Sequence, residues 1–141
     1  MQSTKNIDWI ASKTIADAVD ARIGECLANV VRAFLDHRDI LPEDAVHVEG
    51  IYAYGGQFNL HTWIETANSI IELSLVRDTN KALRESVRHF PILTRDESEI
   101  KKLYGDKPRA PGVWLIMDLN FDDPRVVRLL NEVDTPPGLR Y

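Results

Sequence analysis

The sequence predicts an α+β domain in which N-terminal helices pack on an antiparallel β-sheet. Helical periodicity of apolar residues dominates the chain up to about residue 38, and alternating segments rich in β-branched and aromatic residues follow it. Helices first and strands afterwards are typical of the α+β class. The length of 141 residues, with 44% hydrophobic and 28% charged residues, predicts one globular domain over residues 1–141.

Two helices are expected in the N-terminal part of the chain, meeting near Gly24. Apolar or small residues recur at helical spacing on both sides of it: Ile7, Ile10, Thr14 and Ala18 before, and Ile23, Leu27, Val30, Val31, Phe34 and Leu35 after. Gly24 is the expected break, because a glycine inside a helix costs about 1 kcal/mol relative to alanine. If the second helix begins at Gly24, Cys26 lies in its first turn.

Three strands are expected in the middle of the chain. Residues 46–54 alternate in polarity and end at Gly55-Gly56, as a strand followed by a turn does. Residues 58–65 and 69–76 predict a β-hairpin with a tight turn near Ala67-Asn68.

Shorter elements are expected further along the chain. Residues 78–87 predict a helix that Asp78 or Thr79 caps and that Pro91 closes, and residues 96–104 predict a short helix that ends at Gly105. The remaining expectations are a loop at 107–112, a buried strand at 113–119 and a helix at 124–132.

Charge and composition exclude several classes of protein. The net charge of −5 argues against general binding to nucleic acids or anionic membranes. No apolar run approaches the roughly 20 residues of a membrane span, and the N-terminus has no apolar core behind a basic start. The single cysteine fits a reducing compartment. We therefore expect a cytoplasmic protein with neither a nucleic-acid nor a membrane partner.

The predicted hairpin carries a histidine and a carboxylate on one face. His61, Trp63 and Glu65 share that face because side chains alternate along a strand. A tight turn pairs positions whose numbers sum to about 133 or 135, and either register sets Glu72 opposite or diagonal to His61. A carboxylate bonded to one ring nitrogen leaves the other nitrogen free for a substrate or a thiol, and Cys26 is the only thiol.

This arrangement resembles the transglutaminase-like superfamily of papain-type thiol enzymes. The family pattern is Gly-x-Cys opening a helix, a strand with His-x-Trp-x-Glu, and a strand with an apolar pair and Asp. The matching segments here are Gly24-Glu25-Cys26, His61-Thr62-Trp63-Ile64-Glu65 and Ile70-Ile71-Glu72. The match covers roughly residues 24–76, and in size and layout the chain is most similar to small bacterial proteins related to lasso-peptide leader peptidases.

The resemblance implies a role for each matched residue. Cys26 is the implied nucleophile, His61 the general base and Glu72 the acid that orients it. Trp63 is implied to pack beside the site, with Glu65 as a supporting residue.

The chain departs from the family pattern at two positions. Glu72 stands where the family has Asp, so the acid is one methylene longer. Glu25 beside Cys26 opposes formation of a thiolate unless it points to solvent. For the oxyanion we expect the backbone N–H of Cys26 as one donor, and we name Gln57 as a further candidate.

The implied activity is that of a cysteine-dependent hydrolase or acyltransferase acting on an amide bond of a peptide or side chain, or on a small amide or ester. An alternative is a catalytically silent protein-binding or accessory module, because Cys26 lies in phase with Leu27 and Val30 and cysteine is commonly a core residue. A third option is acyl transfer from a small-molecule donor, similar to arylamine acetyltransferases, although 141 residues leave little room for a cofactor domain.

The remaining polar patterns predict surface features. Four basic residues at helical spacing predict one solvated face, or a dock for an acidic partner: Arg77, Lys81, Arg84 and Arg88. Asp118, Asp122 and Asp123 are better explained by helix capping than by cation binding. The four histidines and one cysteine have no ligand spacing, so we expect no metal site and no cofactor.

Overall fold

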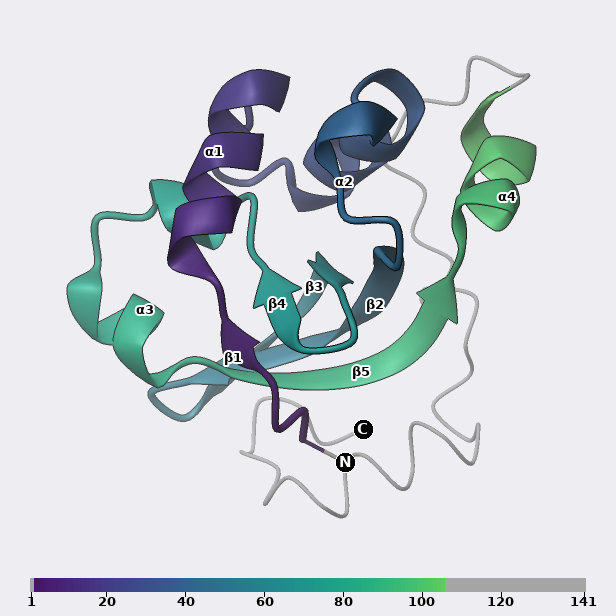
Figure 1. Ribbon diagram of the computed structural model, residues 1–141. Coiled ribbons are helices and arrows are strands. Elements are labelled where there is room, and N and C mark those ends of the chain that lie inside the picture. Colours follow the sequence, from purple (N-terminus) through teal and green to yellow (C-terminus); the bar gives the residue numbers. More distant parts are fainter. Residues whose placement is uncertain (1, 106–141) are drawn as a thin grey trace.

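The computed structural model describes residues 2–105, which form an α+β fold with a five-stranded sheet (Figure 1). The strands are β1 (Asn6–Ile7), β2 (Val46–Tyr54), β3 (Gln57–Glu65), β4 (Ser69–Ile71) and β5 (Arg88–Arg95). The helices are α1 (Trp9–Val19), α2 (Cys26–Asp36), α3 (Lys81–Ser86) and α4 (Glu97–Ile100), with short helical turns at η1 (Arg38–Ile40), η2 (Leu75–Arg77) and η3 (Lys101–Gly105). The features predicted at 107–112, 113–119 and 124–132, and the aspartates at 118, 122 and 123, lie outside the described residues.

The sheet has the strand order β1-β4-β3-β2-β5. β1 pairs with β4 in parallel, and the other neighbours are antiparallel. The N-terminal segment links the two edges of this sheet. Just before the chain enters β1, the backbone N–H of Ser3 donates to the carbonyl of His89 in β5 (2.8 Å). Figure 1 shows β5 curving beneath the other strands toward that segment. The sheet is therefore rolled, and it has an inner and an outer face.

Helices cover the outer face of the sheet. Phe34 and Leu27 of α2 join Ile64 of β3 and Ile71 of β4 in the largest apolar cluster. The inner face holds a second cluster around the fully buried Trp63. Alternation along β3 thus sends Ile64 outward to the helices and Trp63 inward. In the part of the chain that the structure describes, no helix is both long and apolar enough to cross a membrane.

The α+β class and several predicted elements of the first 76 residues are confirmed, but the sheet is mixed rather than antiparallel, because β1 pairs with β4 in parallel. Two helices are separated by a turn that contains Gly24, and β2 has the predicted bounds 46–54. The hairpin pairs Ile64 with Ile71 and Glu65 with Ile70, which is the register in which the numbers sum to 135. Its second strand is shorter than predicted, however, since β4 ends at Ile71.

Other predictions for the helices were wrong in detail. The face of α1 that carries Ile10 points to solvent, with 84% of Ile10 exposed, while Ser12 and Ile15 are buried. Both faces of α1 carry apolar or small residues at helical spacing, so spacing alone does not tell which face is buried. The face that packs against the rest of the protein is the one that carries Ser12 and Ile15. The cap of α3 is Asn80, whose side chain accepts from the backbone N–H of Leu83.

Residues 88–95 form a strand, so the prediction that Pro91 closes a helical segment was wrong. Pro91 lies opposite Gly50 of β2, where the register between β2 and β5 shifts. β5 is an edge strand, because it pairs with β2 alone among the described strands. Proline is tolerated in edge strands and at bulges because no hydrogen bond between strands is lost there. A side chain at Gly50 would collide with the backbone of Phe90, so a glycine is required at this crossing.

A polar cluster lies among the residues of the outer face. His47 of β2 lies 2.5 Å from the hydroxyl of Thr62, and Arg95 forms a buried ion pair with Glu49 (3.1 Å). Burial, and then the charge of Arg95, lower the pKa of His47 to about 3. His47 is therefore neutral in the folded protein at any pH above that value.

We expect stability to fall on acidification because of His47. Below pH 6.5 the unfolded chain protonates this histidine and the folded chain does not, so the free energy of unfolding decreases by up to about 1.4 kcal/mol per pH unit. Urea unfolding at pH 7 and pH 5 measures the loss. In His47→Gln the loss should be smaller by about 2 kcal/mol, and identical losses in both proteins would contradict the assignment.

Candidate functional site

Cys26 is the first residue of α2 and is half-buried. Gly24 has a positive φ of 82°, which turns the chain into the helix, and Glu25 is exposed, so that its carboxylate faces solvent. The first backbone N–H groups of a helix lack intrahelical partners and stabilise negative charge nearby. The thiol of Cys26 thus lies at the end of α2 where these groups are.

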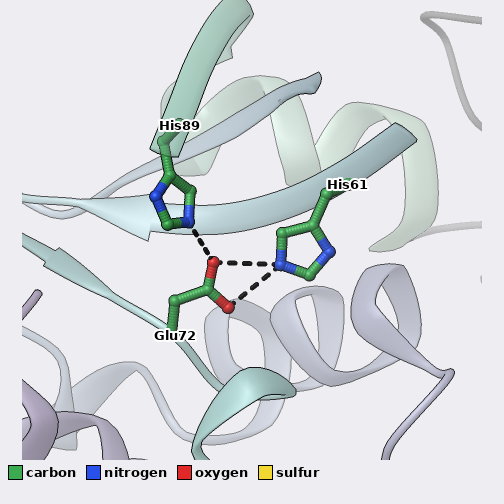
Figure 2. Close-up of side chains that lie close together, drawn as sticks. All are labelled: His61, Glu72 and His89. Carbon is green, nitrogen blue, oxygen red and sulfur yellow. Dashed lines mark hydrogen bonds and ion pairs between the residues drawn. The ribbon is translucent and has the colours of Figure 1, made fainter. Parts of the chain in front are cut away.

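His61 and Glu72 form a buried pair, as the predicted register implies. The Nε2 atom of His61 lies 3.0 Å from each carboxylate oxygen of Glu72 (Figure 2). Glu72 directly follows β4, and its backbone N–H donates to the hydroxyl of Ser12 in α1 (2.8 Å). That hydroxyl in turn donates to the carbonyl of Asp8 (2.6 Å). The first turn of α1 thus fixes the backbone of Glu72 beyond the end of its strand.

His61 and Glu72 each shift the pKa of the other toward the charged form. Burial alone would raise the pKa of Glu72, but the charge and hydrogen bond of His61, and then those of His89, lower it to about 2. Burial likewise lowers the pKa of His61, but the charge of Glu72 and the hydrogen bond with Cys26 raise it to about 10. An ionised carboxylate only accepts, so the Nε2 atom of each histidine, which faces it, carries a proton. The other nitrogen of His61, Nδ1, is left for Cys26.

Sequence reasoning missed His89, a buried histidine in β5. Its Nε2 atom lies 2.5 Å from Oε1 of Glu72, so the carboxylate lies between two imidazole rings (Figure 2). The signal that could have found it is the run of aromatic and β-branched residues after Val87: Phe90, Ile92 and Thr94. The prediction ends the helix at residue 87 and lets Pro91 close that segment, so it places no strand there.

Trp63 and Glu65 lie beside the pair. The ring of Trp63 stacks against that of His61 (centroids 6.0 Å apart) and meets His89 edge to face (4.7 Å). The indole N–H donates to Glu65 (3.0 Å), whose other oxygen accepts from Lys5 (3.0 Å). These contacts fit the packing and supporting positions that the sequence predicts.

Tyr52 is a further neighbour of His61. Tyr52 meets the ring of His61 edge to face at 4.9 Å. Burial, and then the charges of Asp78, Glu72 and Cys26, raise the pKa of Tyr52. Gln57 begins β3, but its side chain lies outside what the structure describes, so its suggested role as oxyanion donor stays a prediction.

Asn29 joins the segment before Cys26 to the segment after Glu72. Its buried amide accepts from the backbone N–H of Arg22 (3.1 Å) and donates to the carbonyl of the same residue (2.8 Å). It also donates to the hydroxyl of Ser74 (2.9 Å). A single side chain in α2 therefore links the loop that leads to the thiol with the chain that follows the carboxylate.

The side chains of His61, Glu72 and His89 are also of the types that bind zinc. Their nearest nitrogen and oxygen atoms lie within 4.8 Å of one another. Two ligands of one tetrahedral zinc lie about 3.3 Å apart, whereas Glu72 lies 2.5 Å from His89, which is a hydrogen-bond distance. The three groups would have to separate to admit a metal, and the hydrogen bonds that hold His61 would be lost. We interpret the cluster as hydrogen-bonded.

The four basic residues predicted to form one helix face are divided among three elements. Arg77 lies in η2 and pairs with Asp17 (2.6 Å), and Arg88 begins β5. Only Lys81 and Arg84 lie in α3, and the guanidinium of Arg84 lies over the ring of Trp9. The predicted continuous helical stripe was therefore wrong, and an acidic partner stays a prediction.

A cavity of about 710 Å³ lies between the N-terminal segment, α3 and the start of β5. Its lining includes Ser3, Trp9, Arg84 and His89, but neither Cys26 nor His61. The cavity thus reaches the cluster from the side of His89, away from the thiol.

Comparison with known proteins returned no relative. No family model, no curated protein and no solved structure matches this chain. Function is therefore argued from the geometry of Cys26, His61, Glu72 and their neighbours.

We expect Asn29→Asp to destabilise the protein by about 1–3 kcal/mol, because it removes two donated hydrogen bonds and turns a carboxylate oxygen toward the carbonyl of Arg22. The guanidinium of Arg32, 2.8 Å from the side-chain oxygen of Asn29, offsets part of this loss. Urea unfolding measures the effect. Asn59→Asp makes the same change at an exposed position of β3 and should alter stability by less than about 0.5 kcal/mol. Equal effects of the two substitutions would argue against the linking role of Asn29.

Proposed function

We propose that this protein is a cysteine-dependent hydrolase or acyltransferase that acts on an amide bond through Cys26, His61 and Glu72, on a transglutaminase-like scaffold. One observation carries the proposal: the buried ring of His61 is bonded to the carboxylate of Glu72, and the thiol of Cys26, at the start of a helix, lies close enough to raise the pKa of that ring. A nucleophile, a base and a group that orients the base are the parts of a thiol-dependent acyl transfer.

In the proposed resting state the proton of Cys26 already lies on Nδ1 of His61, which gives a thiolate–imidazolium pair. The thiolate attacks the carbonyl carbon of the amide, and the oxyanion forms near the backbone N–H of Cys26. His61 then gives its proton to the leaving amine, the C–N bond breaks and an acyl-thioester remains on Cys26. Water or an amine attacks the thioester while His61 takes its proton, and the thiolate–imidazolium pair is regenerated.

Glu72 keeps the base ready for both halves of this cycle. Its carboxylate holds the His61 ring by Nε2 and stabilises the imidazolium that forms each time a proton arrives. The start of α2 stabilises the thiolate at the same moment. The half-buried position of Cys26 supports a reacting thiol rather than one sealed in the core.

We expect iodoacetamide to modify Cys26 rapidly in the native protein, with a rate at pH 6 within about tenfold of that at pH 8. A free thiol loses on the order of 70-fold over this range because its thiolate disappears. Cys26 is the only cysteine, so labelling of the whole chain, measured by mass spectrometry, reports this residue alone.

The controls compare His61 with another histidine. His61→Gln should restore the steep pH dependence of a free thiol. His37→Gln should leave the rate unchanged, because His37 caps the opposite end of the 11-residue α2, about 16 Å away. A native protein that reacts more slowly than the urea-unfolded chain at both pH values would overturn the proposal in favour of a catalytically silent module.

Acyl transfer itself is tested with an activated ester. p-Nitrophenyl acetate should give a stoichiometric burst of nitrophenolate and an acetyl group on Cys26. Cys26→Ala should give no burst while unfolding in urea at nearly the same concentration as the unmodified protein. A burst that survives Cys26→Ala would rule out the assigned nucleophile.

A further inference from the structure

The carboxylate of Glu72 has two hydrogen-bond partners among the described residues, and both are histidines. Oε1 accepts from Nε2 of His89 at 2.5 Å, and both oxygens lie 3.0 Å from Nε2 of His61. The three side chains are almost completely buried. Among the described residues, Tyr52 interacts with the charge of Glu72, and Cys26 interacts with His61. The proposed reaction uses His61 as the base and assigns no role to His89.

The length of the acid raises a positioning problem. Glutamate has one more rotatable bond than aspartate, so its carboxylate is less constrained by its own backbone. The Glu72 backbone lies beyond the end of β4 and is held by Ser12, but that contact leaves the carboxylate free to turn. A second contact at the carboxylate itself is needed to keep it facing His61.

His89 is built to supply that contact. Its backbone lies in β5 opposite Tyr52, and its carbonyl accepts from the N–H of Ser3. Its ring meets the fully buried ring of Trp63 edge to face at 4.7 Å. The backbone pairing with Tyr52, the hydrogen bond from Ser3 and the contact with the Trp63 ring together fix the direction of the His89 Nε2–H bond.

We propose that His89 is a positioning residue, which holds the carboxylate of Glu72 in the orientation that serves His61. Its Nε2–H donates to Oε1 and stops the carboxylate from rotating away from the His61 ring. The effect on Cys26 is indirect and passes through Glu72 and His61. This inference rests on the proposed function, because it assigns His89 a part in preparing the same thiol.

The test measures alkylation of Cys26 by iodoacetamide at pH 6 and pH 8 in two variants of His89. His89→Leu removes the donor, and its pH 6 rate should fall about tenfold or more, since a hydrogen bond to a charged group is lost. His89→Gln keeps an N–H donor, and its rate should return to within about threefold of the unsubstituted protein. His47→Gln changes the buried histidine of the outer face and should leave the pH 6 rate unchanged.

A second arm separates positioning from a general structural effect. In a Glu72→Gln background the carboxylate is absent, so His89→Leu should lower the rate no further. If His89→Leu does not fold, His89→Asn replaces it, because its amide is too short to reach Oε1, and the same loss is expected.

The outcomes distinguish the two proposals. A slow native thiol in the unsubstituted protein overturns the proposed function. A fast thiol that is equally fast in the folded variants lacking the donor overturns the role of His89 and leaves the proposed function standing. Equal losses in the Leu and Gln variants, or an undiminished loss in the Glu72→Gln background, also overturn it.

Discussion

An ionised carboxylate that no solvent reaches is the constraint on which this structure depends. Glu72 is fully buried, and a buried charge costs several kcal/mol unless it is paired and hydrogen-bonded. Two imidazole rings meet that requirement, and they come from β3 and β5. Because these partners lie far apart in the sequence, the carboxylate can be satisfied only when the sheet has rolled. The Ser12 hydroxyl of α1 accepts from the backbone N–H of Glu72 and fixes its main chain.

The same arrangement defines where the thiol lies. Helix α2 packs on the outer face, yet its first residue, Cys26, lies close enough to the inward-pointing ring of His61 to raise the pKa of that histidine. Asn29 fixes the approach to Cys26 by joining the preceding loop to the chain after Glu72. The position of Cys26 therefore follows from the packing of α2 as well as from the hairpin.

Sequence patterns could predict the parts of the site whose geometry is local. The turn between β3 and β4 set the register, and the register alone placed Glu72 within reach of His61. Gly24 signalled the helix start before Cys26 through its backbone preference. His89 could not be found in this way, because β5 meets the end of β4 only through the rolling of the sheet. Asn29 and Ser12 likewise read as ordinary helix residues, since their hydrogen bonds are made with distant segments.

The two buried histidine clusters of the sheet argue for an active role of the inner one. On the outer face, burial and Arg95 keep His47 neutral, and Glu49 is already paired with that arginine. On the inner face, Glu72 and Cys26 favour the imidazolium of His61. Burial lowers the pKa of both rings, so their opposite shifts come from their partners. A cluster with a purely structural role needs only charges that neutralise each other, as Arg95 and Glu49 do on the outer face. The inner cluster differs in that a half-buried thiol at a helix start lies beside it, and the proposed acyl transfer rests on this arrangement.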